Sequence, residues 1–179
     1  MVGGGLEVVY IPNVFCPKTR WTAPVQKRLN RLDEHCAVNS TNDLDRFVQA
    51  QFHVYAEVLR ELRHGQKRSH WMWFIFPQHK ALGRSAMACK YGIYSLEEAR
   101  AYWQHAVLGP RLAECCDALL SVCNRSVHDI FGSPDDLKLC SCMTLFTHAV
   151  TNEARFSLLL EKYFFGIEDA KTLALIQPD

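Results

Sequence analysis

Three side chains have the chemistry of a proton-transfer site. His70 lies in the aromatic run of residues 69–78, where neighbouring rings that exclude water could make an imidazole a neutral base. Asp135 and Asp136 are adjacent carboxylates that could serve as general base, ribose-hydroxyl acceptor or divalent-ion ligand. Each has a structural alternative: a buried histidine making one hydrogen bond, and carboxylates stabilising the first turn of a helix. His70, Asp135 and Asp136 are therefore the candidate catalytic residues.

A dense group of basic side chains comes just before the aromatic run. Its members are Arg60, Arg63, His64, Lys67 and Arg68. Arginine holds a phosphate through two parallel hydrogen bonds, and lysine holds it as a point charge, so Arg63 and Lys67 are candidate ligands for an anion. The alternative is that cations favour the carboxyl end of a helix, which explains Lys67 less well than the arginines before it.

Other side chains could complete a binding site. Trp71 or Trp73 could stack on a base or sugar, although most buried tryptophans only pack in a core. Lys138 lies three residues after Asp135, a spacing that also fits a simple intrahelical salt bridge. The remaining candidates for ligand contact follow on the same predicted helix and are Ser141 and Thr144.

The elements that must position these residues are helices. Apolar residues recur at three- and four-residue steps over 44–62, which predicts one long helix ending at Gly65. Ser95 and Glu98 form a predicted capping box, and Ser133 is expected to cap a helix beginning at Pro134. The fold class is all-α, a single compact array of about seven helices, in which 71–76 is a buried helical or irregular segment. The other predicted helices cover about 84–91, 95–106, 110–122, 133–146, 152–164 and 169–176.

Residues 1–40 differ from the rest of the chain. They open with Gly3-Gly4-Gly5 and are interrupted by Pro12, Pro17 and Pro24. We interpret them as an irregular N-terminal extension and place the helical domain at 41–179. A transit peptide is the weaker alternative, because acidic residues are present and serine is scarce.

Composition excludes several classes of function. With 49% hydrophobic and 22% charged residues the chain is typical of a soluble globular protein. The strongest apolar run, 71–77, is far shorter than the roughly 20 residues of a membrane span. Residues 41–92 carry a net charge of +4 and residues 93–179 one of −5. That suits a small anionic ligand but is too weak to predict nucleic-acid binding, and the common nucleotide, zinc-protease and hydrolase motifs are absent.

The eight cysteines predict free thiols. The sequence shows no secretory signal, is long enough to fold without disulfides, and has cysteines at positions typical of a helical core. None has C-x-x-C spacing, so we expect no metal site. The predicted location is intracellular and reducing, in the cytoplasm.

Several segments resemble one family. They are Phe47–Gln51, Ser69–Gln78, Ser85–Gly92 with Ser95–Ala101, Leu108–Leu112 and Ile130–Phe146. Together these resemble the mainly α-helical family known as domain of unknown function eighteen-ten, often labelled calpastatin in bacterial genomes. The resemblance covers about 43–176 and implies a compact helical domain without implying a reaction. The calpastatin label does not suit this chain, because an inhibitor of that kind is disordered and repetitive.

Two functions are compatible with these features. The first is binding of, or action on, a small anionic ligand such as an ADP-ribose derivative, at a site between 67–78 and 130–144. The second is a non-enzymatic interaction or structural module, in which the aromatic run is core and the charges face solvent. The sequence leaves open whether the chain catalyses a reaction, which cofactor it uses and its oligomeric state.

Overall fold

The computed structural model describes residues 43–177, and these residues form helices joined by loops and turns. The all-α prediction is confirmed: within this range the only β-type pairing is an isolated bridge between His79 and Ile93. The helices are α2 (Asp45–Phe52), α3 (Tyr55–Arg63), α4 (Met72–Ile75), η1 (Lys80–Leu82, a 3₁₀ turn), α5 (Ala86–Tyr91), α6 (Leu96–Gln104), α7 (Leu108–Ser121), α8 (Val127–Phe131), α9 (Asp135–Ala149), α10 (Ala154–Phe164) and α11 (Ala170–Ile176).

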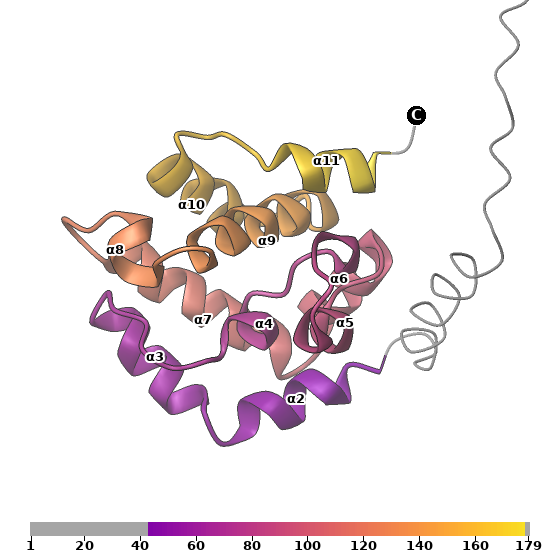
Figure 1. Cartoon of the computed structure of the whole chain (residues 1–179), viewed down its shortest axis with the longest axis horizontal. Helices are drawn as coiled ribbons and strands as arrows, with labels where there is room; N and C mark the ends of the chain where they lie inside the picture. The colour runs from indigo at the N-terminus through magenta and orange to yellow at the C-terminus, as the bar shows by residue number, and fades with distance from the viewer. Residues whose placement is uncertain (1–42, 178–179) are drawn as a thin grey trace, which may run out of the picture. The chain divides into compact units, whose positions relative to one another are not determined.

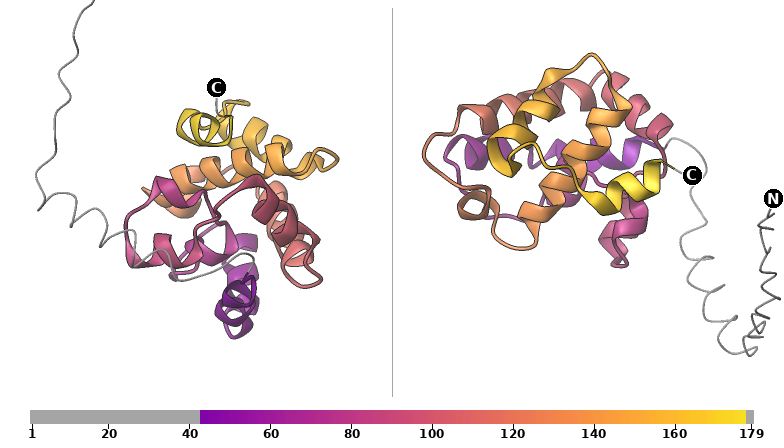
Figure 2. Two further views of the ribbon diagram at one scale, coloured as in Figure 1. Left: turned by 90° about the vertical axis from the view of Figure 1, so that its right-hand side faces the viewer. Right: turned by 90° about the horizontal axis from the view of Figure 1, so that it is seen from above.

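Helix α9 is the centre of the described fold. It packs against α6, α8, α10 and α11. In two views at right angles, α10 and α11 lie on one side of α9 and the α2–α4 region lies on the other (Figure 1 and Figure 2). Residues 141–146 are all buried, because a helix surrounded by other helices has no face left for water.

A row of aromatic rings connects the first helices to the last. Phe47 of α2 meets Tyr102 of α6 edge to face with centroids 5.0 Å apart, and Tyr102 meets Phe146 of α9 at 5.6 Å. Phe146 in turn contacts Phe156 of α10 at 5.4 Å. These distances lie in the favourable range for aromatic pairs, so the row joins four helices through the core.

The single helix predicted over 44–62 is wrong in one respect, because the chain turns at His53 and Val54. The two halves pack on different partners: α2 lies against α4 and α5, whereas α3 lies against α7. The amide of Gln51 also donates to the carbonyl of Phe74 at 2.8 Å, which fixes the end of α2 on α4. Tertiary contacts therefore override the continuous helical pattern.

Several predicted helix ends are confirmed and others are wrong. Gly65 follows the end of α3, and Ser95 caps α6 by accepting from the Glu98 amide. Glu98 does not complete the capping box, because its carboxylate pairs with Arg46 and accepts from the Tyr94 amide. Ser133 does not cap α9, which begins at Asp135 with Pro134 at its N-cap.

The count of about seven helices is too low for the described part of the chain, which has ten α-helices. The break within 44–62 adds one helix, and α8 was not predicted at all because five residues are too short for a periodic pattern. The predicted extension over 1–40 lies outside the described residues. Between 43 and 177, no helix is both long enough and apolar enough to cross a membrane.

Gly109 gives a test of how closely α6 and α7 approach. A Cβ atom at this position would lie 1.9 Å from the carbonyl oxygen of Trp103. Helix propensity alone would make Gly109→Ala stabilising by about 1 kcal/mol. We expect the opposite sign in urea denaturation, a loss of about 2–3 kcal/mol from overpacking. The control Ala113→Gly on α7 should lose only about 1 kcal/mol, and a stabilised Gly109→Ala protein would contradict the close approach.

Candidate functional site

A buried carboxylate organises the loop after α3. Glu61 is only 4% exposed, yet it accepts four hydrogen bonds from the next turn of chain. The donors are the amide of Arg68 (2.8 Å), the amide and hydroxyl of Ser69 (3.2 and 2.7 Å) and the indole N–H of Trp71 (2.8 Å). Both carboxylate oxygens are therefore occupied, and residues 68–71 are fixed against α3.

These hydrogen bonds control the charge of Glu61. Burial alone would raise the pKa of this carboxyl group, but the donors from Arg68, Ser69 and Trp71 outweigh it. The pKa is lowered below its usual value of 4.5, so Glu61 is ionised at neutral pH.

The chain leaves α3 through a left-handed turn at Gly65. The amide of Gly65 donates to Leu62 O at 2.9 Å and the amide of Gln66 donates to Glu61 O at 3.0 Å, the pairing of a Schellman motif. Gly65 has φ +62°, and a Cβ there would lie 2.8 Å from Cδ of Arg125. The positive φ favours glycine at this position, and a Cβ would also displace the Arg125 stem that crosses it.

A cavity of about 200 Å³ opens beside this turn. Its lining comes from the end of α3, from the loop that Glu61 fixes and from the segment before α8. The lining residues are Arg60, Glu61, His64, Gln66, Arg68 and Arg125. We call it the arginine pocket.

The arginines of this pocket differ in how far they are already neutralised. Arg60 forms an ion pair with Glu57 on the same helix. Arg68 donates to the amide oxygen of Gln66 at 2.9 Å, and neither it nor Arg125 has a carboxylate partner within residues 43–177. Two guanidinium groups are therefore available to an anion, each with a planar array of donors.

The predicted residues Lys67, Asp135 and Lys138 come together on the other side of the same loop. The ammonium groups of Lys67 and Lys138 both lie 2.7 Å from the carboxylate of Asp135, and all three side chains are mostly buried. Burial acts to raise the pKa of Asp135, but the hydrogen bonds from Lys138 and Lys67 outweigh it and lower the pKa below its usual 3.8. The intrahelical salt bridge predicted as the alternative for Lys138 is present.

The two tryptophans have different environments. Trp71 is 1% exposed, packs edge to face on Phe131 at 6.1 Å and donates to Glu61, so the core interpretation holds for it. Trp73 is half-buried, and the ammonium of Lys138 lies 3.9 Å from its ring centroid. A cation already occupies that ring face.

The two remaining candidates for proton transfer, Asp136 and His70, have different surroundings. The carboxylate of Asp136 lies 2.9 Å from the imidazole Nδ1 of His128. The sequence analysis did not predict this partner. His70 is exposed rather than buried among the rings beside it. The buried position predicted for His70 from the aromatic run is therefore not found, because the backbone turns this side chain to the surface.

Three further candidates serve contacts between helices. Ser141 donates to the carboxylate of Asp169 at 3.1 Å, and Thr144 accepts from the Asp169 amide at 2.9 Å. Asp169 is the N-cap of α11, so these hydroxyls attach α11 to α9. Arg63 pairs with Glu114 of α7 at 3.0 Å and does not line the arginine pocket.

Sequence reasoning missed Glu61, Gln66 and Arg125. Glu61 falls on the apolar face of α3, where a charged residue could have signalled a buried hydrogen-bonding role. Arg125 gave no signal, because nothing in its local sequence shows that it crosses Gly65.

The described residues contain no cluster of three or more histidine, cysteine, aspartate or glutamate side chains suited to a metal ion. Six described cysteines are free thiols. Cys115, Cys116 and Cys142 are buried, and burial raises the pKa of the Cys115 thiol to about 12. Cys16 and Cys36 lie outside the described residues.

Comparison with known proteins gives a family. The model of the family described as "Protein of unknown function (DUF1810)" matches residues 41–176. The chain belongs to this family. A crystal structure of a conserved hypothetical protein from Mycobacterium tuberculosis is 57% identical, with a TM-score of 0.74, and the match covers 75% of this chain and 96% of that one. No curated protein matches the chain.

The DUF1810 match includes both the Glu61-bonded loop and the Asp135 ion group. The resemblance seen in the sequence is therefore confirmed at the level of the family and its helical fold. It assigns no reaction or ligand, so the chemistry must be argued from the side chains themselves.

The Glu61 hydrogen bonds can be tested in this DUF1810 chain by Glu61→Gln. The glutamine side chain would place an NH₂ group against the N–H and O–H donors that now bind the carboxylate. We therefore expect the free energy of unfolding to fall by about 3 kcal/mol. The wild-type contribution is complete above pH 4.5 and is lost as pH falls through the lowered pKa of the folded protein. Urea denaturation between pH 7 and pH 2 should therefore show a smaller pH dependence in the variant.

The control for this experiment is Glu161→Gln, at an exposed position of α10. It should leave both the stability and its pH dependence nearly unchanged. Equal effects of the two substitutions would show that the buried carboxylate contributes no more than a surface one.

The Asp135 ion group gives a second test. Asp135→Ala leaves the ammonium groups of Lys67 and Lys138 partly buried without their carboxylate. Breaking a fully buried pair costs about 3–5 kcal/mol, and partial exposure reduces our expectation to about 2 kcal/mol. Chemical denaturation at pH 7 measures it, and a loss below about 0.5 kcal/mol would place this group among ordinary surface ion pairs.

Proposed function

We propose that this protein binds a small anionic ligand through a phosphate-like group held in the arginine pocket. The observation that carries the proposal is the pair Arg68 and Arg125, two guanidinium groups without carboxylate partners in the described chain that line one cavity. Arginine forks match the oxygens of phosphate and carboxylate groups, so an anion satisfies donors that the chain leaves open.

The size of the cavity limits how much of the ligand it encloses. Sites for whole drug-sized molecules measure about 300–1,000 Å³, whereas the arginine pocket measures about 200 Å³. It suits one anionic group, with the rest of a larger molecule outside. A nucleotide-derived ligand of the ADP-ribose kind would then be held by its phosphate end.

The electric field of α3 opposes an anion at this position, because a helix carries partial negative charge at its carboxyl end. That charge amounts to about half an elementary charge, and the ionised Glu61 adds one more, whereas Arg68 and Arg125 supply two positive charges that no ion pair within residues 43–177 neutralises. The last carbonyls of α3 are also occupied, since Arg60 O and Leu62 O accept from the amides of His64 and Gly65. The balance at the pocket favours negative ligands.

The proposal keeps the class of ligand predicted from the sequence and changes its anchor. Lys67 and Arg63 were the predicted cations, but each already has a carboxylate partner. Arg68 and Arg125 take their place. His64 adds an acceptor beside them: its Nδ1 lies 2.6 Å from Arg60 O, so Nδ1 carries the hydrogen, and Nε2 of the neutral ring can accept from a ligand hydroxyl or water.

A second function, an interaction module, is favoured by one observation. Phe165 is 93% exposed, and Leu137 and Ile167 are also exposed large apolar residues. Ile167 O accepts from the thiol of Cys140, which lies one helical turn after Leu137. Self-association detected by light scattering and abolished by Phe165→Ser, together with a ligand screen that finds nothing, would favour this function.

The binding proposal predicts the behaviour of Arg125→Gln. Charge-assisted hydrogen bonds contribute about 1.5–3 kcal/mol each, so Kd for pyrophosphate or a phosphomonoester should rise about tenfold or more. Titration calorimetry on the full chain measures it, at low salt because screening weakens the attraction.

The matched control is Arg63→Gln, on the same helix as part of the pocket but paired with Glu114. It should change Kd by less than about twofold, since it lies outside the lining. If Arg63→Gln weakens binding as much as Arg125→Gln does, the anion is held by diffuse charge and the pocket is not its site.

A further inference from the structure

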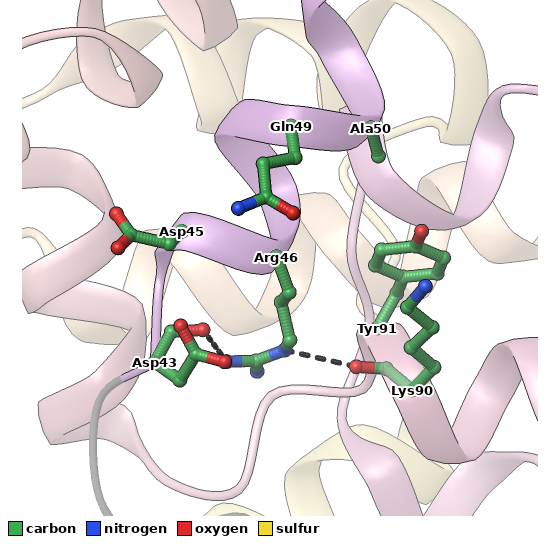
Figure 3. A pocket seen from close by; sticks show the side chains of 7 residues that line it. All are labelled: Asp43, Asp45, Arg46, Gln49, Ala50, Lys90 and Tyr91. Carbon is green, nitrogen blue, oxygen red and sulfur yellow. Dashed lines mark hydrogen bonds between the residues drawn. The ribbon is translucent and has the colours of Figure 1, made fainter.

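A second cavity lies between α2 and α5, and it shares no lining residue with the arginine pocket. It measures about 430 Å³, within the range of about 300–1,000 Å³ typical of small-molecule sites. Its lining residues are Asp43, Asp45, Arg46, Gln49, Ala50, Lys90 and Tyr91 (Figure 3).

The rear of this cavity is rigid because Arg46 is fully engaged. Its Nε donates to the carbonyl of Lys90 at 2.9 Å, and its NH2 lies 2.6 Å from the carboxylate of Glu98. The guanidinium also lies 4.3 Å from the ring centroid of Phe47. Arg46 therefore fixes α2 on α5, and Glu98 neutralises its charge.

The other polar side chains of the cavity form no hydrogen bond or ion pair with residues 43–177. Tyr91 is only 7% exposed, its ring contacts Phe47 and Phe74, and its hydroxyl has no hydrogen-bond partner in the described part of the chain. Lys90 forms no ion pair there and lies 5.2 Å from the Tyr91 ring centroid. The Tyr91 ring is buried while its hydroxyl reaches the cavity, so this hydroxyl is open to a ligand.

The free charges of the cavity have both signs. In the view of Figure 3, Asp43 and Asp45 lie on one side of the Arg46 side chain, and Lys90 and Tyr91 lie on the other. With Arg46 neutralised by Glu98, two carboxylates and one ammonium remain. A simple anion meets the carboxylates, and a simple amine leaves Lys90 and Tyr91 unused.

We propose that this cavity binds a small zwitterion that carries both an ammonium and a carboxylate, the chemical class of a free amino acid. The ligand carboxylate accepts from Lys90 Nζ and the Tyr91 hydroxyl, and the ligand ammonium donates to Asp45 or Asp43. Gln49, with a donor and an acceptor, contacts the remaining polar atoms. This site is independent of the arginine pocket and of the proposed function, because it uses other residues and a ligand of no net charge.

The experiment is titration of the full chain with glycine, L-serine and L-glutamine, observed by saturation-transfer NMR and calorimetry. Acetate and ethylamine serve as the carboxylate-only and ammonium-only probes. We expect at least one amino acid to bind more than tenfold more tightly than either probe. No amino acid binding at 10 mM, the top of the titration, or acetate binding as tightly as the best amino acid, would overturn the proposal.

Variants test which side chains hold the ligand. Tyr91→Phe keeps the packed ring and removes only the hydroxyl, and Asp45→Asn changes an exposed side chain, so both should fold. Each should weaken amino acid binding about tenfold or more, whereas Lys171→Gln on the exposed surface of α11 should not change it. Binding that is indifferent to both Tyr91→Phe and Asp45→Asn would refute this site while leaving the arginine pocket untouched.

Discussion

One buried carboxylate fixes the arrangement on which both polar regions of the site depend. Glu61 holds the backbone of Arg68 and Ser69 and the indole of Trp71. A charge so deeply buried is tolerated only when hydrogen bonds replace its water, and the four donors do so. The consequence is a loop with one geometry: Trp71 enters the core, Lys67 turns to α9 and Arg68 turns to the cavity.

The cations around this loop form two groups, one paired with Asp135 and the other lining the arginine pocket. Around Asp135 the ammonium groups of Lys67 and Lys138 are close to a carboxylate and to tryptophan rings, so the group is complete in itself. In the arginine pocket Arg68 and Arg125 lack such a partner within the described chain. Residues of the same charge thus stabilise the fold in one place and remain available for a ligand in the other.

Features that depend on residues close in the sequence could be predicted, and features that depend on contacts between distant segments could not. Gly65, Ser95 and the Asp135–Lys138 pair depend on residues a few positions apart, and all were predicted correctly. The turn at residues 53–54 and the crossing of Arg125 over Gly65 depend on contacts between distant segments, which periodicity does not reveal. His70 was misjudged for the same reason: its neighbours are buried, but the direction of one side chain is set by the loop.

The helical class and family could be recognised early because the described chain is built from helix patterns and specific short segments. The candidate site was only half predicted. The sequence singled out the loop at residues 67–71, but the residues that line the cavity are supplied by three separate segments, and one of them, before α8, carries no motif.

Lys67 and Arg68 are consecutive residues whose side chains belong to different groups. The amide of Lys67 is bonded to Ile130 O at 2.7 Å and the amide of Arg68 to Glu61, so the peptide unit between them has little freedom to rotate. The backbone that separates the arginine pocket from the Asp135 ion group is thus two residues long and is anchored to α8 on one side and to α3 on the other.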